Sequence, residues 1–143
     1  MQMKKMLALV LVLMLTLGAA QAATLVTANA QSVVNQVNRE RAARGLSALR
    51  IDPALTAAAQ IRAKEIVQKF SHTRPDGTKW STVSSAAYGE NIAKGQKTAD
   101  KVMAAGMSSS GHRANILRAS HGSIGVACLQ SGGVYYWVQL FGR

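Results

Sequence analysis

The amino-acid sequence predicts an α/β protein, a three-layer α-β-α sandwich around a small, mainly antiparallel sheet. Near the start of the domain, apolar residues recur at the spacing of one helix face, at Ala30, Val33, Val34 and Val37. Two β-rich runs, 124–129 and 134–141, are joined by a glycine-containing hairpin turn over 130–133. Both faces of the second run are largely apolar, with Tyr135, Trp137, Gln139 and Phe141 on one and Tyr136, Val138 and Leu140 on the other. A strand that is apolar on both faces is covered on both sides, which predicts helices above and below the sheet.

The first 22 residues have the three parts of a secretory signal peptide. Lys4 and Lys5 give a basic start, an apolar stretch runs from Met6 to Leu17, and Ala20-Gln21-Ala22 has the small-residue pattern of a cleavage site. We therefore expect a signal peptide over 1–22, with cleavage after Ala22.

The alternative to cleavage is a retained membrane anchor. The stretch from Met6 to Ala23 is close to the lower limit of about 18 residues for a spanning helix. The cleavage pattern favours removal, and no later stretch is apolar for long enough to span, so no transmembrane segment is expected after cleavage. The rest of the chain divides into a tether over 23–29 and one domain over 30–143.

Helix signals place two long helices in the first half of the domain. The first is expected to begin at Ala30 and to end before Gly45, a residue suited to the position after a helix. Asp52 followed by Pro53 starts the second, because the aspartate can cap the helix and proline fits the first helical position. The predicted buried stripe of this second helix is Leu55, Ala59, Ala63, Ile66 and Phe70.

The middle of the chain is expected to be less regular. A long loop covers 71–87, and a short extended piece follows over 89–93. Thr98 can cap a third helix that runs to Met107, and Ser110 can cap a short fourth helix that runs to Arg118.

The chain is strongly basic and has a single cysteine. The formal net charge is +11 and the isoelectric point is near 10.6, which predicts attraction to anionic cell-envelope polymers or lipid headgroups. The basic residues are scattered with little aromatic interleaving, which argues against a specific nucleic-acid reader. Cys128 cannot form an intramolecular disulfide and is expected to be a small core residue. We expect a monomer.

Three residues are the candidates for a shared functional site. His72, Glu90 and His112 each lie at the end of a predicted element, where functional side chains are usually presented. Two imidazoles and one carboxylate suit Zn²⁺ or another divalent cation, and no organic cofactor is expected. Their spacing matches no local metal motif, so two other interpretations stay open. His112 can simply open its helix, and Glu90 can pair with an arginine or lysine.

Two further features bear on catalysis. Gly106 to Ser110 is similar to a serine hydrolase elbow, but Ser110 stands where the second glycine is needed, and no strand precedes it. His121 has no helper residue nearby and is expected to lie in a surface loop. The sequence therefore offers no nucleophile with a clear partner.

Eight segments in order resemble the motifs of a bacterial domain of the CAP superfamily, the SCP-like extracellular proteins. They are Asn38 to Arg41 with Gly45 to Leu49, Asp52 to Leu55, Phe70 to His72, Arg74 to Gly77, Gly89 to Ala93, Ser110 to Leu117, Ile124 to Val126 and Tyr136 to Phe141. The resemblance implies an α/β/α sandwich and a cleft that holds His72, Glu90 and His112. In some members of the family this cleft binds a divalent cation. The resemblance also implies that Asn91 braces the cleft loop.

The chain departs from the family pattern at two places. The segment from Lys101 to Ser110 lacks the second glutamate that eukaryotic members often have. Gly106 stands where bacterial members frequently have tryptophan, which removes a large side chain from the edge of the cleft.

The expected function is a secreted, non-catalytic module whose cleft binds a cation or small ligand. Its ligand-binding residues would be His72, Glu90, Asn91 and His112, and its basic surface would associate with the cell envelope. The alternative is a metal-dependent hydrolase of peptides or cell-wall polymers, with Glu90 as general base acting on bound water. A lipid binder is a further alternative. The expected location is extracellular or at the cell envelope.

Overall fold

The computed structural model describes residues 22–143. The signal peptide expected over 1–22 lies outside the described residues except for Ala22, so it stays a prediction. Among the described residues, no helix combines the length and apolar character needed to cross a membrane.

A five-stranded sheet forms the middle layer. Its strands are β1 (Thr24–Leu25), β2 (Arg50–Ile51), β3 (Gly89–Lys94), β4 (Ser123–Ser131) and β5 (Val134–Gly142). The order is β1-β4-β5-β3. The short strand β2 pairs with the same edge of β4 as β1 does, but at the start of β4 rather than at its end. Only β2 runs parallel to its neighbour, so the sheet is mainly antiparallel, as predicted.

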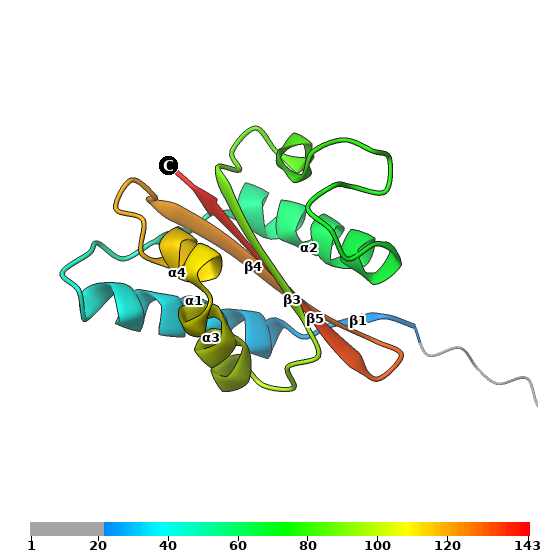
Figure 1. Ribbon diagram of the computed structural model, residues 1–143, viewed down its shortest axis with the longest axis horizontal. Coiled ribbons are helices and arrows are strands. Elements are labelled where there is room, and N and C mark those ends of the chain that lie inside the picture. Colours follow the sequence, from blue (N-terminus) through cyan, green and yellow to red (C-terminus); the bar gives the residue numbers. More distant parts are fainter. Residues whose placement is uncertain (1–21) are drawn as a thin grey trace, which may run out of the picture.

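Helices cover both faces of this sheet. They are α1 (Thr27–Ala42), α2 (Pro53–Gln68), α3 (Ala99–Ser108) and α4 (Ser110–Ile116), with a short 3-10 helix, η1 (Trp80–Val83), in the predicted loop. Figure 1 shows α2 on one side of the strands and α1, α3 and α4 on the other. The three-layer α-β-α sandwich predicted from the sequence is confirmed.

The central strand β5 contributes to both hydrophobic cores, as its alternating pattern predicts. Trp137 and Phe141 pack in the core under α1, α3 and α4. Val138 and Leu140 pack in the core under α2. The strand lies between β4 and β3, so its backbone is hydrogen-bonded on both sides.

Two of the predicted helix caps are present. The backbone N–H of Ala54 donates to Asp52 Oδ1 at 2.9 Å, and that of Lys101 donates to Thr98 Oγ1 at 3.1 Å. The fourth helix differs from the prediction at both ends. Ser109 rather than Ser110 is its N-cap residue, and the helix ends at Ile116 rather than Arg118.

Two expectations about the first half of the chain are wrong. Residues 23–29 are not a tether, since they form β1 and the first turn of α1. Phe70 is not part of the buried stripe of α2, because the helix ends at Gln68 and the Phe70 side chain is 43% exposed. The Phe70 ring instead contacts Lys94, whose ammonium group lies over the ring at 4.9 Å from its centre.

Candidate functional site

Two of the three predicted site residues are in direct contact. Glu90 lies in β3 with its side chain fully buried, and His72 lies in the loop after α2 with its side chain 55% exposed. His72 Nδ1 is 2.8 Å from Glu90 Oε1. The buried carboxylate is therefore held by the sheet, and the His72 ring that contacts it is partly exposed to solvent.

Arg62 of α2 completes this contact and was not foreseen from the sequence. Its Nε donates to Glu90 Oε2 at 2.7 Å and its Nη2 donates to Glu90 Oε1 at 3.1 Å, so the pair is bidentate. Arg62 is fully buried. It lies on the same face of α2 as Ala58, Ala59 and Ile66, and a charged residue on an apolar helix face was the signal that could have revealed it.

Electrostatics keep this arginine charged despite its burial. Burial alone would lower the pKa of Arg62, but hydrogen bonds and charge from Glu90 and Glu65 together raise it above its ordinary value. Because a guanidinium can only donate hydrogen bonds, the Glu90 carboxylate is the acceptor in both of them. Because Arg62 and His72 both approach that carboxylate, we assign the proton of the His72 ring to Nδ1.

A second carboxylate extends the network to the loop that carries His72. Glu65 accepts from Arg62 Nη1 at 2.9 Å and from Arg74 Nη2 at 2.9 Å. Burial would raise the pKa of Glu65, yet the hydrogen bonds and charges of Arg74 and Arg62 lower it. Arg62 also donates to the backbone oxygen of Ser71 at 2.7 Å. Two arginines and two glutamates thus fix the backbone on either side of His72.

His112 lies in the first turns of α4 and is positioned through its backbone. Asn91 Nδ2 donates to the His112 backbone oxygen and to Gln139 Oε1, both at 3.0 Å. Asn115 Nδ2 in turn donates to Asn91 Oδ1 at 2.9 Å. Burial lowers the pKa of His112, and the nearby charge of His72 lowers it further. The two histidines are therefore close enough to affect each other electrostatically, and burial favours the neutral form of His112.

A second buried arginine anchors the other end of α4. Arg41 of α1 is fully buried, and its Nη1 donates to the backbone oxygens of Ile116 and Arg118, both at 2.9 Å. Its Nε donates to the Ser47 backbone oxygen at 2.8 Å. These bonds satisfy carbonyl groups at the C-terminal end of α4, so the helix that carries His112 is fixed at both ends.

A cavity of about 160 Å³ lies beside His112, between α3, α4 and the sheet. Most of its lining is apolar. The lining residues are Asn91, Ile92, Ala93, Gln96, Val102, Ala105, Gly106, Ser109, His112, Trp137 and Gln139. Gly106 is part of the wall, and a Cβ atom there would lie 3.6 Å from Ile116 Cδ1 and 4.0 Å from His112 Cβ. The glycine therefore leaves room that a side chain could fill.

The residues expected to bind a divalent cation do not form a set suited to that role. Among residues 22–143, no three His, Cys, Asp or Glu side chains lie close enough together to hold a metal ion. Both oxygens of Glu90 already accept hydrogen bonds from Arg62, and a guanidinium that close opposes a second cation. The expectation that Glu90 pairs with an arginine therefore describes the geometry better than the metal hypothesis does.

His121 does not lie in a surface loop, so this prediction is wrong. The residue is only 5% exposed, and its ring stacks on Phe141 with the ring centres 5.2 Å apart. Within the described part of the chain, neither ring nitrogen has a hydrogen-bond partner. Burial, with the charges of Arg118, Arg41 and Arg143, lowers the pKa of His121 to about 4. It is a neutral core residue at physiological pH.

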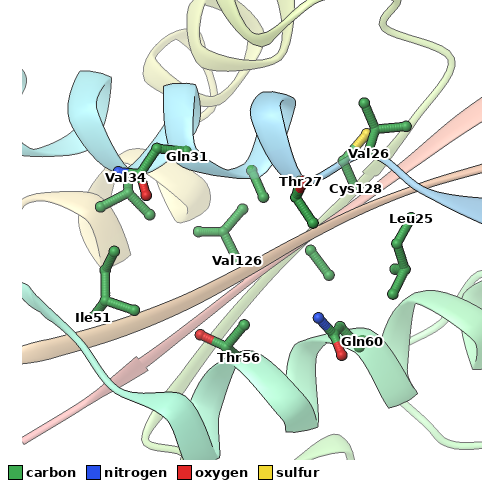
Figure 2. A pocket seen from close by; sticks show the side chains of 12 residues that line it. Leu25, Val26, Thr27, Gln31, Val34, Ile51, Thr56, Gln60, Val126 and Cys128 are labelled. Atoms are coloured by element: carbon green, nitrogen blue, oxygen red, sulfur yellow. The ribbon is translucent and has the colours of Figure 1, made fainter.

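A second cavity, of about 170 Å³, lies between α1 and α2 beside β4. Figure 2 shows Val34 and Gln31 of α1 facing it from one side and Thr56 and Gln60 of α2 from the other. Its lining contains no histidine or acidic residue. Burial raises the pKa of its one thiol, Cys128, to about 11, so this cysteine is not a reactive nucleophile. The cavity beside His112 is therefore the better candidate.

Comparisons with known proteins match both the sequence and the fold. The model of the cysteine-rich secretory protein family, CAP, matches residues 34–141. The protein YkwD of Bacillus subtilis is 40% identical over 124 residues, which cover 81% of this chain and 48% of that protein. This chain thus spans about half the length of that relative.

Two solved structures of similar fold come from bacteria. An outer surface protein of Borrelia burgdorferi has a TM-score of 0.75 at 20% identity, covering 85% of this chain and 98% of that one. An extracellular protein of Bacillus anthracis that contains an SCP domain has a TM-score of 0.74 at 23% identity, covering 82% of this chain and 41% of that one. At these identities the two structures support the fold.

Proposed function

This chain belongs to the cysteine-rich secretory protein (CAP) family, and we propose that it is a non-catalytic extracellular module that binds a small ligand beside His112 and adheres to the cell envelope. The extracellular location is supported by the signal-peptide pattern and by the extracellular and outer-surface proteins that share the fold. The other parts of the proposal depend on the Glu90 network, the cavity and the charge.

The observation that carries the proposal is that both carboxylate oxygens of Glu90 are already hydrogen-bonded. A general base must be free to accept a proton from water or substrate. The Glu90 side chain has no exposed surface, and Arg62 and His72 hold its oxygens at 2.7–3.1 Å. Both oxygens of the carboxylate are therefore already used in hydrogen bonds. The geometry thus supports a structural role for Glu90, in which it holds the half-exposed His72 ring in place; neither residue lines the cavity beside His112.

The cavity beside His112 supports binding of a small, mainly apolar molecule. Ligand sites are typically concave and apolar with a few fixed polar groups. Here Val102, Ala105 and Trp137 supply apolar walls, and His112 with Gln96 supplies polar groups. A neutral His112, favoured by its lowered pKa, suits an uncharged ligand.

The charge balance supports adhesion to anionic polymers. The sequence has 17 Lys and Arg against six Asp and Glu. Three of the acidic residues, Glu40, Glu65 and Glu90, are in salt bridges with arginine. Each such pair cancels one positive and one negative charge, so the excess of basic residues is carried by the rest of the chain. Such an excess attracts polyanions in a salt-dependent way.

One experiment separates this proposal from the metal-dependent hydrolase. The purified protein is incubated with peptide and muropeptide libraries, with and without added Zn²⁺ and with and without a chelator, and products are followed by mass spectrometry. We expect no turnover under any condition. Circular dichroism first checks that Glu90→Gln and His121→Phe are folded. Turnover that the chelator stops in the wild-type protein, and that folded Glu90→Gln loses while His121→Phe keeps it, would replace the binding module with the hydrolase.

A second experiment addresses adhesion. The protein is cosedimented with purified cell wall while the NaCl concentration rises from low to about 1 M, where the screening length falls to about 3 Å. We expect the bound fraction to fall steeply with salt, and anionic vesicles serve as the comparison for lipid headgroups. Binding that is absent, or that salt leaves unchanged, would remove envelope adhesion from the proposal. Stronger binding to vesicles than to cell wall would favour the lipid alternative.

A further inference from the structure

One residue that lines the cavity beside His112 has a buried polar atom without a partner. Gln96 lies in the turn between β3 and α3, and its Oε1 is buried without a hydrogen bond to any described residue. Leaving a buried amide oxygen unpaired is costly, and most such groups in native proteins are satisfied. The atom is therefore an unsatisfied acceptor on a residue of the cavity wall.

The other amide side chains of the cavity are already paired. Asn91 binds His112 and Gln139 through Nδ2 and accepts from Asn115. Gln139 Nε2 donates to Met103 Sδ at 3.7 Å. Gln96 is thus the amide in this lining that offers an open acceptor, and a ligand would not have to break a bond to reach it.

The remaining walls favour a flat apolar body. Trp137 lines the cavity and is 2% exposed, and its Nε1 donates to the Gln96 backbone oxygen at 2.9 Å. This bond fixes the ring of Trp137 and the backbone of Gln96 relative to each other. A planar aromatic ligand can stack on such a ring or meet its edge. The opposite wall includes Gly106, which has no side chain to obstruct the space.

From these observations we propose that the cavity binds a single aromatic molecule of phenol or indole size, with its N–H or O–H donating to Gln96 Oε1. The volume of about 160 Å³ agrees with this size, because apolar protein cavities of roughly 150 Å³ accept benzene. The inference rests on the proposed binding function of the His112 cavity and specifies the class of its ligand. A charged ligand fits less well, since no ionised side chain lines the cavity.

Binding of 5-fluoroindole to the full chain is measured by ¹⁹F NMR. We expect saturable binding to one site, with the dissociation constant in the range from about 0.1 to 1 mM that nine or ten heavy atoms can provide. Competition with unlabelled phenol and indole should displace the probe. Failure of indole and phenol to bind would overturn the proposal.

Two glycine variants locate the site. Gly106→Leu places a side chain in the cavity, and we expect it to weaken binding at least tenfold. Gly111→Leu is the matched control, because Gly111 also lies in a helix and a Cβ atom there would meet nothing within 4 Å. Equal binding by wild type and Gly106→Leu would place the probe elsewhere and overturn the proposal. Circular dichroism of both variants checks that each is folded.

A variant of the acceptor tests the hydrogen bond. Gln96→Met keeps the length of the side chain and removes the amide oxygen. It should weaken the binding of indole by about five- to tenfold, which is the effect of losing one neutral hydrogen bond. Benzothiophene, which has the same shape as indole but no N–H donor, should bind wild type and Gln96→Met equally. An equal loss for both ligands would contradict the assigned donor and acceptor.

The outcomes also separate this inference from the proposed function. If no aromatic probe binds but the protein still adheres to cell wall and shows no turnover, only the ligand class is wrong. If turnover is found, the binding module itself fails, whatever the result with indole.

Discussion

Arg62 and Glu90 face each other with both side chains fully buried, and two hydrogen bonds of 2.7 and 3.1 Å join the guanidinium to the carboxylate. The pair connects α2 to β3 across one face of the sheet. A buried charge that loses its partner is much more costly than an exposed one, so this contact allows a sharp test.

Removing either charge should destabilise the protein strongly. For Arg62→Met and for Glu90→Gln we expect the free energy of unfolding to fall by about 3–5 kcal/mol, because each change leaves one buried group without its partner. The double variant should lose less than the sum of the two single variants. Chemical denaturation followed by circular dichroism provides all three values.

The chain offers a matched exposed pair as the control. Glu40 and Arg44 form a salt bridge on α1, and their side chains are 40% and 37% exposed. Glu40→Gln should change the free energy of unfolding by less than about 1 kcal/mol. Comparable losses at the two pairs would mean that burial does not set the strength of the Arg62–Glu90 contact.

His121 should make the protein less stable in acid. Its pKa is about 4 in the folded protein, against about 6.5 when exposed in the unfolded chain. As the pH falls from 6.5 to 4, the unfolded chain takes up a proton that the folded chain does not. The free energy of unfolding should therefore fall over this range, by up to about 3 kcal/mol from this residue. Denaturant titrations at half-unit pH intervals measure the slope.

His121→Phe is the variant that isolates this effect. Phenylalanine keeps a flat ring against Phe141 and removes two ring nitrogens that lack partners. We expect a smaller loss of stability between pH 6.5 and 4, with the remainder due in part to His112, whose pKa is also lowered. An unchanged pH slope in this variant would assign the acid sensitivity to other groups.

Gly125 should tolerate no side chain. It lies in β4 where the backbone of α2 crosses the sheet, and a Cβ atom on it would overlap the backbone atoms of Leu55 and Thr56. Gly125→Ala should lower the free energy of unfolding by about 3 kcal/mol or more, since two backbone segments must separate. Gly111→Ala should instead stabilise by about 0.5–1 kcal/mol, because alanine favours the helix and has room. Thermal unfolding measures both variants, and we expect a lower melting temperature for Gly125→Ala and a higher one for Gly111→Ala. An unchanged melting temperature for Gly125→Ala would contradict the close contact between β4 and the backbone of α2.

The Cys128 thiol should be inert while the protein is folded. It is 1% exposed, and burial raises its pKa to about 11 although a weak bond from Asn29 opposes the shift. At pH 8 the thiolate fraction is then about one in a thousand. We expect a disulfide reagent to modify it only at the rate of unfolding, and within seconds in denaturant. Rapid modification of the native protein would contradict this burial.

The parts of the fold that follow from local patterns were predictable. The alternation in 134–141 specified which residues of β5 face each core, and Asp52 and Thr98 specified where α2 and α3 begin. These features depend on neighbouring residues and on backbone geometry. Sequence order carries that information directly.

The parts that depend on distant partners were not predictable. β1 and β2 are two residues each and exist only because they pair with β4 from opposite ends of its edge. Nothing within Thr24–Leu25 indicates a strand, which explains why 23–29 were interpreted as a tether. His121 is similar, since only the position of Phe141 in the folded sheet reveals that it is buried.

The candidate site was predictable in some of its members but not in its chemistry. The sequence pointed to His72 and Glu90, and the structure brings them into contact. It gave no indication that Arg62 would occupy the carboxylate, because that contact spans 28 positions and two different elements. The presence of the arginine changes the interpretation from a metal-bound base to a fixed ion pair.

The strand shared by both cores also limits when the protein can fold during translation. Residues 134–142 are made after every helix, yet Trp137 and Phe141 complete one core and Val138 and Leu140 complete the other. A ribosome that has released only the helices has produced surfaces with no partner. Folding therefore waits for the last strand and is a single late event. A chain cut short before residue 134 should be degraded rather than fold into a smaller stable unit.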